Sequence, residues 1–496
     1  MLGRYLRNLA VATAAVGIML TSQSSAFCQI GNGGGNLGGG NLGGGGNLGG
    51  GGNLGGGAGG GANGPATGGI EVDAYGVISS RTFAGNSSML NRARFAAAQA
   101  SVNKDVQKPS QFRKISLTRL EQEVQKLVDA GKPIPAEMRY LAGMTKITNV
   151  FFYPESKEIV IAGPAEGFYI NANNHVVGMK SGLATLQLQD LIVALRCFGP
   201  QGNKTQIISC SIDPTQEGLA NFRNTYTQIA RSGKFRRGME NEVIGLYKDS
   251  LGLQQITIEG VSTKTNFARV LVEADYQMKL MGIGLKSPPK GVKITSFIEK
   301  AQPNTVAKSS LQRWFFQPDY DCVLVNDDET AMELVGNGVK LVGEDESIVG
   351  NGQRKRTGGV NRASMAYCNS FTRSYSKLAE KAPLWGELRN VIDMSVVAAF
   401  IQEMDFYAQA EWDMELFGDE SKLAVEILEA PTQVAPVANA VWKGNYFMSP
   451  IAGGVNIQPR VALNSDRLKK DESGEIDKAK SNVQLSNLAD GQWWWD

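Results

Sequence analysis

Acidic, basic and aromatic side chains that could bind a ligand occur together in one short stretch of the chain. Asp319 and Asp321 flank Tyr320 in a predicted hairpin turn. Arg313 and Trp314 precede this turn, so acids and aromatic rings could converge there as they do in carbohydrate sites. The structural alternative is that aspartate forms the turn and that Trp314 is simply buried.

A second acidic and aromatic pair, Asp275 and Tyr276, lies in the most strongly periodic predicted helix. Large aromatic side chains beside charged groups are costly in a core and useful at a recognition surface, so we predict that this helix faces the hairpin across a cleft. The predicted ligand-binding residues are Asp275, Tyr276, Arg313, Trp314, Asp319 and Tyr320. Alternatively, the helix carries ordinary i,i+4 ion pairs on its surface: Arg269 with Glu273, and Asp275 with Lys279.

His175 is the only histidine in the chain, which excludes several kinds of site. A zinc site with several histidines, a two-histidine metallopeptidase and a two-histidine iron site cannot form within one chain. The run Asn173-Asn174-His175 favours a surface histidine beside a turn. The run from Gly202 to Thr205 lacks the adjacent glycine and lysine of a phosphate-binding loop. The sequence therefore indicates no metal site and no cofactor.

Four cysteines are candidates for disulfide bonds in a chain that we predict to be exported: Cys197, Cys210, Cys322 and Cys368. None of them shows the C-x-x-C spacing of a metal site. Three pairings are open. We favour Cys197 with Cys210 and Cys322 with Cys368, because the members of each pair are closest in sequence.

The charge of the chain is nearly balanced, with 50 lysines and arginines against 48 aspartates and glutamates in 496 residues. A nucleic-acid partner is therefore not indicated. After the N-terminal region, roughly 425 residues remain, which is enough for two or three domains with their own cores.

Residues 1–26 have the features of a signal peptide in the expected order. Arginines precede an apolar run from Leu9 to Leu20, and Ala26 ends a small-residue cleavage site. We therefore predict export to the periplasm, the cell surface or the medium. A retained anchor is the alternative, but the run is shorter than the roughly twenty residues that span a bilayer. Lipidation of Cys28 is a second alternative, although Phe27 is bulky where a lipoprotein signal needs a small residue.

Residues 27–69 are almost entirely glycine, interrupted by repeated Asn-Leu pairs. Glycine loses the most backbone entropy on ordering and offers no side chain to bury, so these repeats cannot build a core. We predict a disordered, flexible linker that reaches on the order of 35 Å. No integral membrane span is expected after cleavage of the signal peptide.

Residues 70–287 alternate strands and helices, which favours an α/β layer within an α+β fold. The sequence predicts a helix from about Thr118 to Ala130, with Thr118 and Glu121 as a capping box. Val150–Tyr153 and Ile159–Ala162 read as a β-hairpin. Further predicted elements are a helix at 186–195, a strand at 207–212, a helix begun by Asp213 and Pro214, a helix at 240–251, a strand at 255–261 and a helix over 267–281.

Residues 288–465 begin with four predicted strands, at 313–316, 322–325, 331–334 and 339–342, which we expect to form one antiparallel meander. Two long helices follow, Ser364–Lys381 and Leu384–Phe406. The second is apolar on all sides over Ser395–Ile401 but bounded by acids, which predicts a core helix and not a membrane span. Residues 466–496 form a charged tail that ends in Trp493, Trp494 and Trp495. We expect these tryptophans to dock on the domain, and insertion at a membrane interface is the alternative.

Five short phrases occur in a recognisable order along the chain: Arg139–Gly143, Ala162–Gly167, Cys210–Thr215, Ala268–Tyr276 and Arg313–Tyr320. Together they resemble phrases of a family of exported planctomycete proteins known only as a domain of unknown function. The resemblance covers roughly residues 111–459 and leaves the linker outside. It implies an envelope or secreted protein, and it implies no catalytic residue, substrate or cofactor.

We predict from these features an exported cell-envelope binding or structural protein, displayed on the glycine-rich linker, with an envelope polysaccharide or a protein as its partner. The alternative is a carboxylate-dependent hydrolase that acts on envelope polysaccharide. That alternative needs two acids roughly 5 to 9 Å apart, which the sequence does not reveal.

Overall fold

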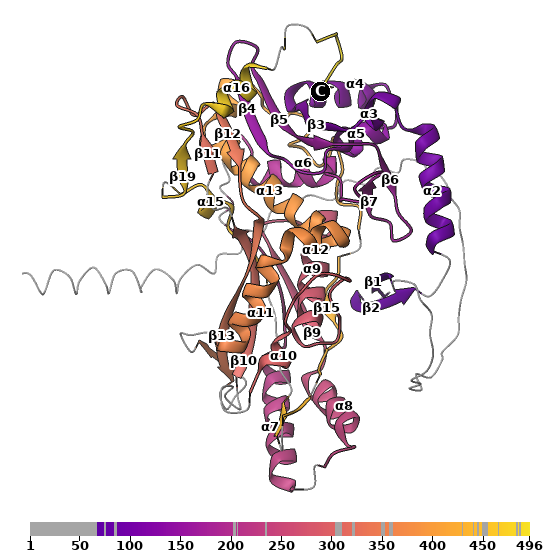
Figure 1. Cartoon of the computed structure of the whole chain (residues 1–496), viewed down its shortest axis with the longest axis vertical. Coiled ribbons are helices and arrows are strands. Elements are labelled where there is room, and N and C mark those ends of the chain that lie inside the picture. Colours follow the sequence, from indigo (N-terminus) through magenta and orange to yellow (C-terminus); the bar gives the residue numbers. More distant parts are fainter. Residues whose placement is uncertain are drawn as a thin grey trace, which may run out of the picture. The chain divides into compact units, whose positions relative to one another are not determined.

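The computed structural model describes residues 67–496 except 74–75, 84–86, 202–204, 206, 234–235, 303–309, 320–322, 349–352, 357–360, 429, 440, 444–445, 449–454, 465, 483–484 and 486–487. The predicted signal peptide and the linker up to residue 66 lie outside the described residues. The described part is a mixed α+β fold, which confirms the predicted class (Figure 1).

A seven-stranded sheet is built from segments far apart in the sequence, in the order β19-β11-β12-β4-β5-β3-β20. Its strands are β3 (Ser110–Ser116), β4 (Asn149–Tyr153), β5 (Glu158–Ala165), β11 (Val323–Val325), β12 (Ala331–Leu334), β19 (Leu468–Lys470) and β20 (Trp494–Trp495). All neighbours pair antiparallel except β11 and β19. The predicted hairpin of β4 and β5 is thus confirmed.

The two faces of this sheet bury two separate apolar clusters. Val150 and Phe152 of β4 join the main core, whereas Phe151 between them joins a smaller cluster with Ile476. This division follows from the alternation of side chains along a strand. The main core also receives helix α4 (Leu117–Asp129), and the smaller cluster receives α16 (Glu475–Ser481).

A six-stranded sheet has the order β1-β2-β15-β9-β8-β18. Its strands are β1 (Thr67–Val72), β2 (Val77–Phe83), β8 (Ile208–Asp213), β9 (Gln254–Glu259), β15 (Gln433–Val434) and β18 (Val455–Ile457). Strands β8 and β9 pair antiparallel, although α7 (Gln216–Ser232) and α8 (Glu240–Leu251) lie between them in the sequence. This unit therefore differs from a parallel strand-helix-strand crossover. Its two helices pack against each other through Leu219 and Leu251.

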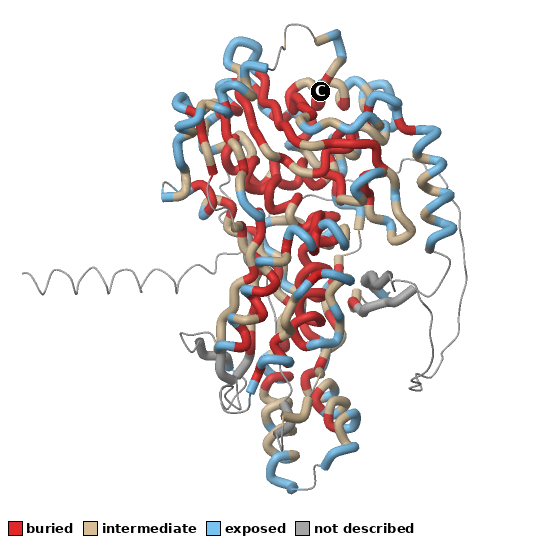
Figure 2. Tube along the Cα trace, in the orientation of Figure 1, coloured by how far each residue is buried: buried red, intermediate tan, exposed pale blue. Residues whose placement is uncertain are grey.

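Three helices form the centre of the main core: α6 (Leu188–Cys197), α9 (Asn266–Gly282) and α13 (Pro383–Glu403). They pack on one another, and nearly every residue of α9 and of α13 is buried (Figure 2). No helix in the described part of the chain has the length and apolarity needed to cross a bilayer. Because α9 and α13 are enclosed on all sides, their charged residues must find partners inside the protein.

The predicted four-stranded meander is wrong in its pairing, although all four strands exist. Strand β10 (Ser310–Asp319) pairs with β13 (Gly338–Ile348), which also pairs with β14 (Arg354–Arg356). The hairpin of β11 and β12 instead joins the seven-stranded sheet, where Ala331 of β12 lies opposite Phe151 of β4. Strand patterns identify strands but not their partners, and the apolar face of β4 attracts the hairpin away from its sequence neighbours.

Three predicted helix boundaries also need correction. Ser116, not Thr118, caps α4 by accepting from the backbone of Arg119 at 3.3 Å. Thr215, rather than Asp213, caps α7. The helix predicted over Ser364–Lys381 is two helices, α11 (Arg362–Arg373) and α12 (Tyr375–Lys381), which meet at Ser374.

Glu121 serves tertiary structure instead of the predicted capping box. Its buried carboxylate accepts from the backbone N–H groups of Leu416 at 2.9 Å and Phe417 at 2.7 Å, and from the indole of Trp412. These bonds tie α4 to the segment after α13. A capping glutamate would bond within its own helix, so the spacing of Thr118 and Glu121 has a different cause here.

The remaining elements connect and cover these sheets and helices. They are α2 (Ser87–Ser101), α3 (Lys104–Gln107), α5 (Ala136–Arg139), the 3-10 turn η1 (Leu141–Gly143), β6 (Phe168–Ile170), β7 (Val176–Gly178), α10 (Phe297–Lys300), α14 (Phe406–Gln409), β16 (Val441–Lys443), β17 (Tyr446–Met448) and α15 (Pro459–Ala462).

The tail after residue 466 docks on the fold, as predicted. Trp493 is buried, and β20 pairs with β3 so that Trp494 lies opposite Ile115. Arg113 of β3 is fully buried, and it binds the Asp496 carboxylate through Nε at 2.8 Å and stacks on the Trp494 ring at 4.5 Å. The same tail supplies β19, so both edge strands of the seven-stranded sheet come from it.

Candidate functional site

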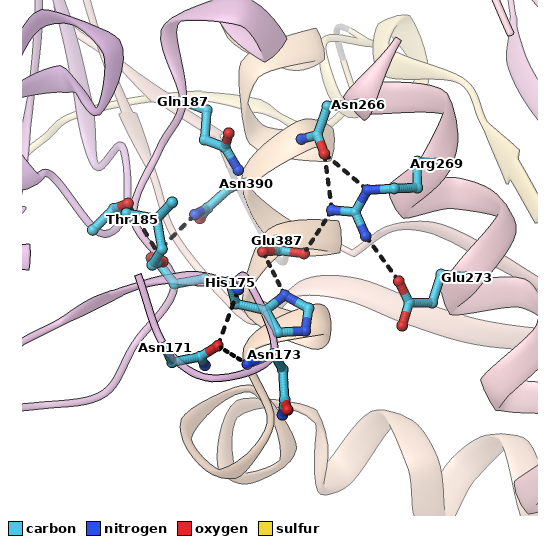
Figure 3. Close-up of polar contacts among 12 residues, drawn as sticks. Asn171, Asn173, His175, Thr185, Gln187, Asn266, Arg269, Glu273, Glu387 and Asn390 are labelled. Carbon is cyan, nitrogen blue, oxygen red and sulfur yellow. Dashed lines mark hydrogen bonds and ion pairs between the residues drawn. The ribbon is translucent and has the colours of Figure 1, made fainter. Parts of the chain in front are cut away.

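The sole histidine, which the sequence places on the surface, lies largely buried at the end of the β6–β7 hairpin. The Asn171 side chain accepts from the backbone N–H groups of Asn173 at 2.9 Å and His175 at 3.0 Å. Asn174 adopts the left-handed conformation that asparagine tolerates, with φ of 62°. This turn directs the His175 ring toward α13, where only 11% of the side chain remains exposed (Figure 3).

Glu387 on α13 is the partner of His175. Its Oε1 lies 2.8 Å from Nδ1 of the imidazole, and its side chain is buried. Pro383 begins α13, and Gly386 lets the helix approach Ala184, because a Cβ on Gly386 would lie 3.1 Å from the Ala184 Cβ. The close approach of α13 thus places the Glu387 carboxylate within hydrogen-bond distance of the His175 imidazole.

Arg269 and Glu273 on α9 extend this pair into a cluster. Nη1 of Arg269 donates to Glu273 Oε2 at 2.9 Å, and Nη2 lies 3.7 Å from Glu387 Oε2. The guanidinium also donates twice to Asn266 Oδ1, at 2.8 and 2.9 Å. The i,i+4 pair predicted for this helix therefore exists, but Glu273 is buried and Arg269 is 30% exposed.

Asp190 on α6 closes the far side of the cluster. Its Oδ2 accepts from Asn266 Nδ2 at 2.8 Å, whereas its buried Oδ1 has no hydrogen-bond partner among the described residues. Hydrogen bonds and charge contacts thus run from His175 through Glu387, Arg269 and Asn266 to Asp190. We call these five residues and Glu273 the His175 cluster.

The environment divides the acids of the His175 cluster into two kinds. Burial raises the pKa of Asp190 to about 7 and also raises the pKa of Glu273, in each case against the pull of Arg269. Burial acts on Glu387 in the same direction, but His175 and Arg269 outweigh it and lower the pKa of this carboxyl. For His175, burial lowers the pKa, while the charge and hydrogen bond of Glu387 prevail and raise it.

This arrangement can hold and move protons. Opposite pKa shifts on two neighbouring carboxyls are the pattern by which an acid and a base are assigned. Nδ1 of His175 is bonded to Glu387, which fixes the ring and leaves Nε2 for solvent or a ligand. Within the described residues, no group of three or more His, Cys, Asp and Glu side chains is arranged to hold a metal ion.

The predicted acidic and aromatic residues of α9 are buried in the core. Asp275 is fully buried and pairs with Lys279 at 2.9 Å, and Lys279 also donates to the carbonyl of Ile212 at 2.9 Å. Tyr276 is likewise buried. The predicted i,i+4 pair of Asp275 with Lys279 therefore exists, but it lies in the core and not on the surface of the helix.

Trp314 is also a core residue. Its side chain is fully buried, and its indole donates to Ser364 Oγ at 2.7 Å and packs edge-on against Tyr367 at 4.7 Å. The end of α9 does meet β10, through Gly282, where an added Cβ would lie 2.3 Å from the Trp314 ring. The two segments are therefore in van der Waals contact at this point.

The other predicted ligand-binding residues contact separate partners. Arg313 lies 3.5 Å from Asp213 and covers the Phe315 ring at 5.0 Å. Asp319 lies 3.6 Å from Lys340 on the neighbouring strand. Tyr320 and Asp321 lie outside the described residues. A recognition role for Arg313, Asp319 and Tyr320 stays a prediction.

The predicted disulfides do not appear in the structure. Cys197, Cys210 and Cys368 are buried free thiols, so the bridge between Cys197 and Cys210 is absent, and Cys368 is not bridged. Cys322 lies outside the described residues. Instead, the Cys197 thiol donates to the Gly260 carbonyl at 3.1 Å, and Cys210 faces the core from β8. Proximity in sequence did not bring these side chains together.

The His175 cluster was missed at the sequence level, although two signals pointed to it. A lone histidine follows three turn-forming residues, and Glu387 interrupts an apolar helix that proved to be buried on all sides. A buried glutamate needs a partner, which could have directed attention to the only histidine. No local pattern, however, shows which helix the β6–β7 hairpin contacts.

Comparisons with known proteins address one segment of the chain. Residues 210–297 match the family model described as "Protein of unknown function (DUF1598)". No curated protein and no solved structure matches the chain. The matched segment runs from β8 to the start of α10 and contributes Asn266, Arg269 and Glu273 to the His175 cluster. The chain thus carries, at residues 210–297, a DUF1598 domain of unknown function.

Proposed function

We propose that the protein is an exported binding or structural protein of the cell envelope, displayed on its glycine-rich linker, and that the His175 cluster is its ligand site. The order of charged, apolar and small residues in positions 1–26 supports export. Further phrases, beyond residues 210–297, resemble those of exported planctomycete proteins, and this resemblance also supports a location outside the cytoplasm. The large, fully packed core supports a rigid scaffold for binding.

One observation carries the choice of site: a buried ion-pair network reaches the surface at two places. Glu387 and Glu273 are enclosed, whereas 30% of the Arg269 side chain and 11% of the His175 side chain remain exposed. Charged groups that are fixed by buried partners are preorganised for binding. A network with a purely structural role has no need of an open edge.

The balance of charge in the His175 cluster favours a neutral, hydroxyl-rich ligand. Arg269 and, when it is protonated, His175 offset the carboxylates of Glu387 and Glu273, and ionisation of Asp190 adds a further negative charge, so a polyanion gains little here. A polysaccharide offers hydroxyl groups that both donate and accept, and the partly exposed guanidinium and imidazole present N–H donors to them. We therefore propose an envelope polysaccharide as the first ligand class to test, with a protein partner as the second.

A binding screen with matched variants tests this proposal. The purified chain is titrated against a panel of envelope polysaccharides and peptides. We expect His175→Gln to weaken binding roughly ten-fold, since it removes one charge-assisted hydrogen bond. The thermal midpoint should also fall, because the buried Glu387 carboxylate loses the charge of its partner, so binding is compared at a temperature at which the variant is folded. Lys264→Ala, an exposed cation just before α9, serves as the control and should bind normally. Equal binding by His175→Gln and the control would refute the assignment.

A carboxylate-dependent hydrolase is a second candidate, because Glu273 and Glu387 flank one guanidinium with opposite pKa shifts. Glu273 would then be the acid and Glu387 the base or nucleophile. We expect such an enzyme to release reducing ends from the polysaccharide that it binds, and Glu273→Gln to abolish release but not binding. Binding without any release by the unmodified chain would reject this candidate.

A further inference from the structure

A cavity of about 480 Å³ opens at the end of α13 that is opposite to Glu387. It is lined by Gly199, Pro200, Gln201, Gln402, Asp405, Tyr407, Ala408, Glu411 and Asp413. Fifteen residues of helix separate Glu387 from Gln402, which corresponds to about 22 Å. The cavity is therefore distinct from the His175 cluster, and its volume falls within the range of small-molecule sites.

Tight backbone turns hold the acidic wall of this cavity in place. Asp405 adopts the left-handed conformation, with φ of 56°, where α13 gives way to α14, and Glu411 does so after α14, with φ of 50°. Gln402 donates to the carbonyl of Gly199 at 2.8 Å, which fixes the opposite wall. The lining residues are thus positioned by the fold.

The charge of the lining is negative. Asp405, Glu411 and Asp413 contribute carboxylates, and Asp405 and Asp413 are exposed and form no ion pair among the described residues. Glu411 is already paired with an ammonium group, that of Lys157 from the β4–β5 turn. The chain itself therefore shows that an ammonium group fits against this wall.

Tyr407 is a second and independent indication of a ligand. Its side chain lines the cavity but is buried, with 4% of the residue exposed, and its hydroxyl has no hydrogen-bond partner among the described residues. Its ring packs against Trp412 with centroids 5.5 Å apart. Leaving a buried hydroxyl without a hydrogen bond is unfavourable, and a ligand that bonds this hydroxyl recovers the cost.

We infer that this cavity binds a small organic molecule that carries a primary ammonium group. An ammonium has three N–H donors, which match the carboxylates of Asp405 and Asp413 and the hydroxyl oxygen of Tyr407. Charge-assisted bonds of this kind are the strong ones. A diamine, an amino sugar and a free amino acid share this chemistry.

Titration calorimetry of the full chain tests the inference, with putrescine as the probe and 1,4-butanediol as its uncharged counterpart. We expect putrescine to bind at one site and butanediol not to bind. Glucosamine and lysine, in separate titrations that compete with putrescine, distinguish the sources of the ammonium group. Absence of putrescine binding, or tighter binding of calcium chloride that the same carboxylate variants remove, would overturn the inference.

Three variants locate the site. Asp405→Asn and Asp413→Asn should each weaken putrescine binding roughly ten-fold, and asparagine also tolerates the backbone at position 405. Tyr407→Phe should weaken binding while the thermal midpoint of the ligand-free chain stays the same or rises, since it deletes only the unbonded hydroxyl. Glu415→Gln, whose carboxylate already pairs with Lys422 at 2.8 Å outside the cavity, is the control. Unchanged binding in Asp405→Asn and Asp413→Asn would refute the site whatever the outcome at His175.

Discussion

The charged residues of α9 and α13 show how burial changes the meaning of a sequence pattern. Arg269 and Glu273 have the spacing of a surface ion pair, which contributes little in water. Enclosed between α9 and α13, the same pair holds the carboxylate of Glu387 and, through Asn266, that of Asp190. The pattern was legible in the sequence, whereas the enclosure depends on how α13 packs.

Asp190 should make the stability of the protein depend on pH. Its pKa rises from 3.8 to about 7 on folding, so the folded state binds the proton more tightly. This contribution is fully present below pH 3.8 and is lost as pH rises through 7. We expect Asp190→Asn to raise the free energy of unfolding at pH 8 by a few kcal/mol, which is the size that the pKa difference between the folded and unfolded states gives. At pH 4 the variant should change the free energy of unfolding little.

Denaturant unfolding at pH 4, 6 and 8 measures this effect. His175 and Glu273 also have raised pKa values, so they too lower the stability of the folded state as pH rises. Because both residues are still present in Asp190→Asn, the variant keeps this part of the pH dependence. Glu387, with a lowered pKa, acts in the opposite direction at low pH. Asp490→Asn, at an exposed aspartate, is the matched control. Parallel pH profiles for Asp190→Asn and the unmodified chain would contradict the prediction.

The buried thiols should resist alkylation in the folded protein. Burial raises the pKa of Cys197 and of Cys368 to about 12, and it raises the pKa of Cys210 well above its usual value, so little reactive thiolate forms at neutral pH. We expect iodoacetamide to modify none of the three in native protein and all three after unfolding without reductant. Mass spectrometry of the peptides decides. Thiols that stay unmodified in the unfolded chain would instead reveal disulfides in the exported form.

Helices and strands were largely predictable from sequence, because periodicity and turn residues act locally. The helix at 240–251 and the hairpin of β4 and β5 follow their patterns closely. Strand partners were not predictable, since β12 and β13 are neighbours in sequence but belong to different sheets. The candidate site was even harder to predict from the sequence, because it forms only where the β6–β7 hairpin, α9 and α13 come together in the fold.

The strand β20 should contribute to stability through the pair of Arg113 and Asp496. Arg113 is fully buried, so loss of its carboxylate leaves an unbalanced internal charge, although Asp496 is 43% exposed and solvent screens part of the interaction. We expect Asp496→Asn to lower the free energy of unfolding by about 1 kcal/mol. Denaturant unfolding measures the change, with Glu472→Gln on the same tail as the control. No difference between the two variants would show that the pair of Arg113 and Asp496 adds nothing to the stability of the fold.

For the molecule as a whole, we predict that the chain is exported from the cytoplasm. A signal peptide at residues 1–26 should be removed, so N-terminal sequencing of the mature protein is expected to begin near Phe27. Fractionation of cells that express the full chain should place it outside the cytoplasm. A chain that keeps Met1 and stays in the cytoplasm would contradict both export and display on the linker.

The seven-stranded sheet also constrains when the protein can finish folding. Its edge strands β19 and β20 are synthesised long after β3, β4 and β5, and they cover the open edges of β11 and β3. Until then the growing chain presents unpaired N–H and C=O groups, which invite pairing with other chains. Closure of the sheet therefore waits until residues 468–495 have been synthesised. Such a delay keeps the nascent chain incompletely folded, as passage through an export channel requires. We expect the chain to depend most on a chaperone during the interval before residues 468–495 are synthesised.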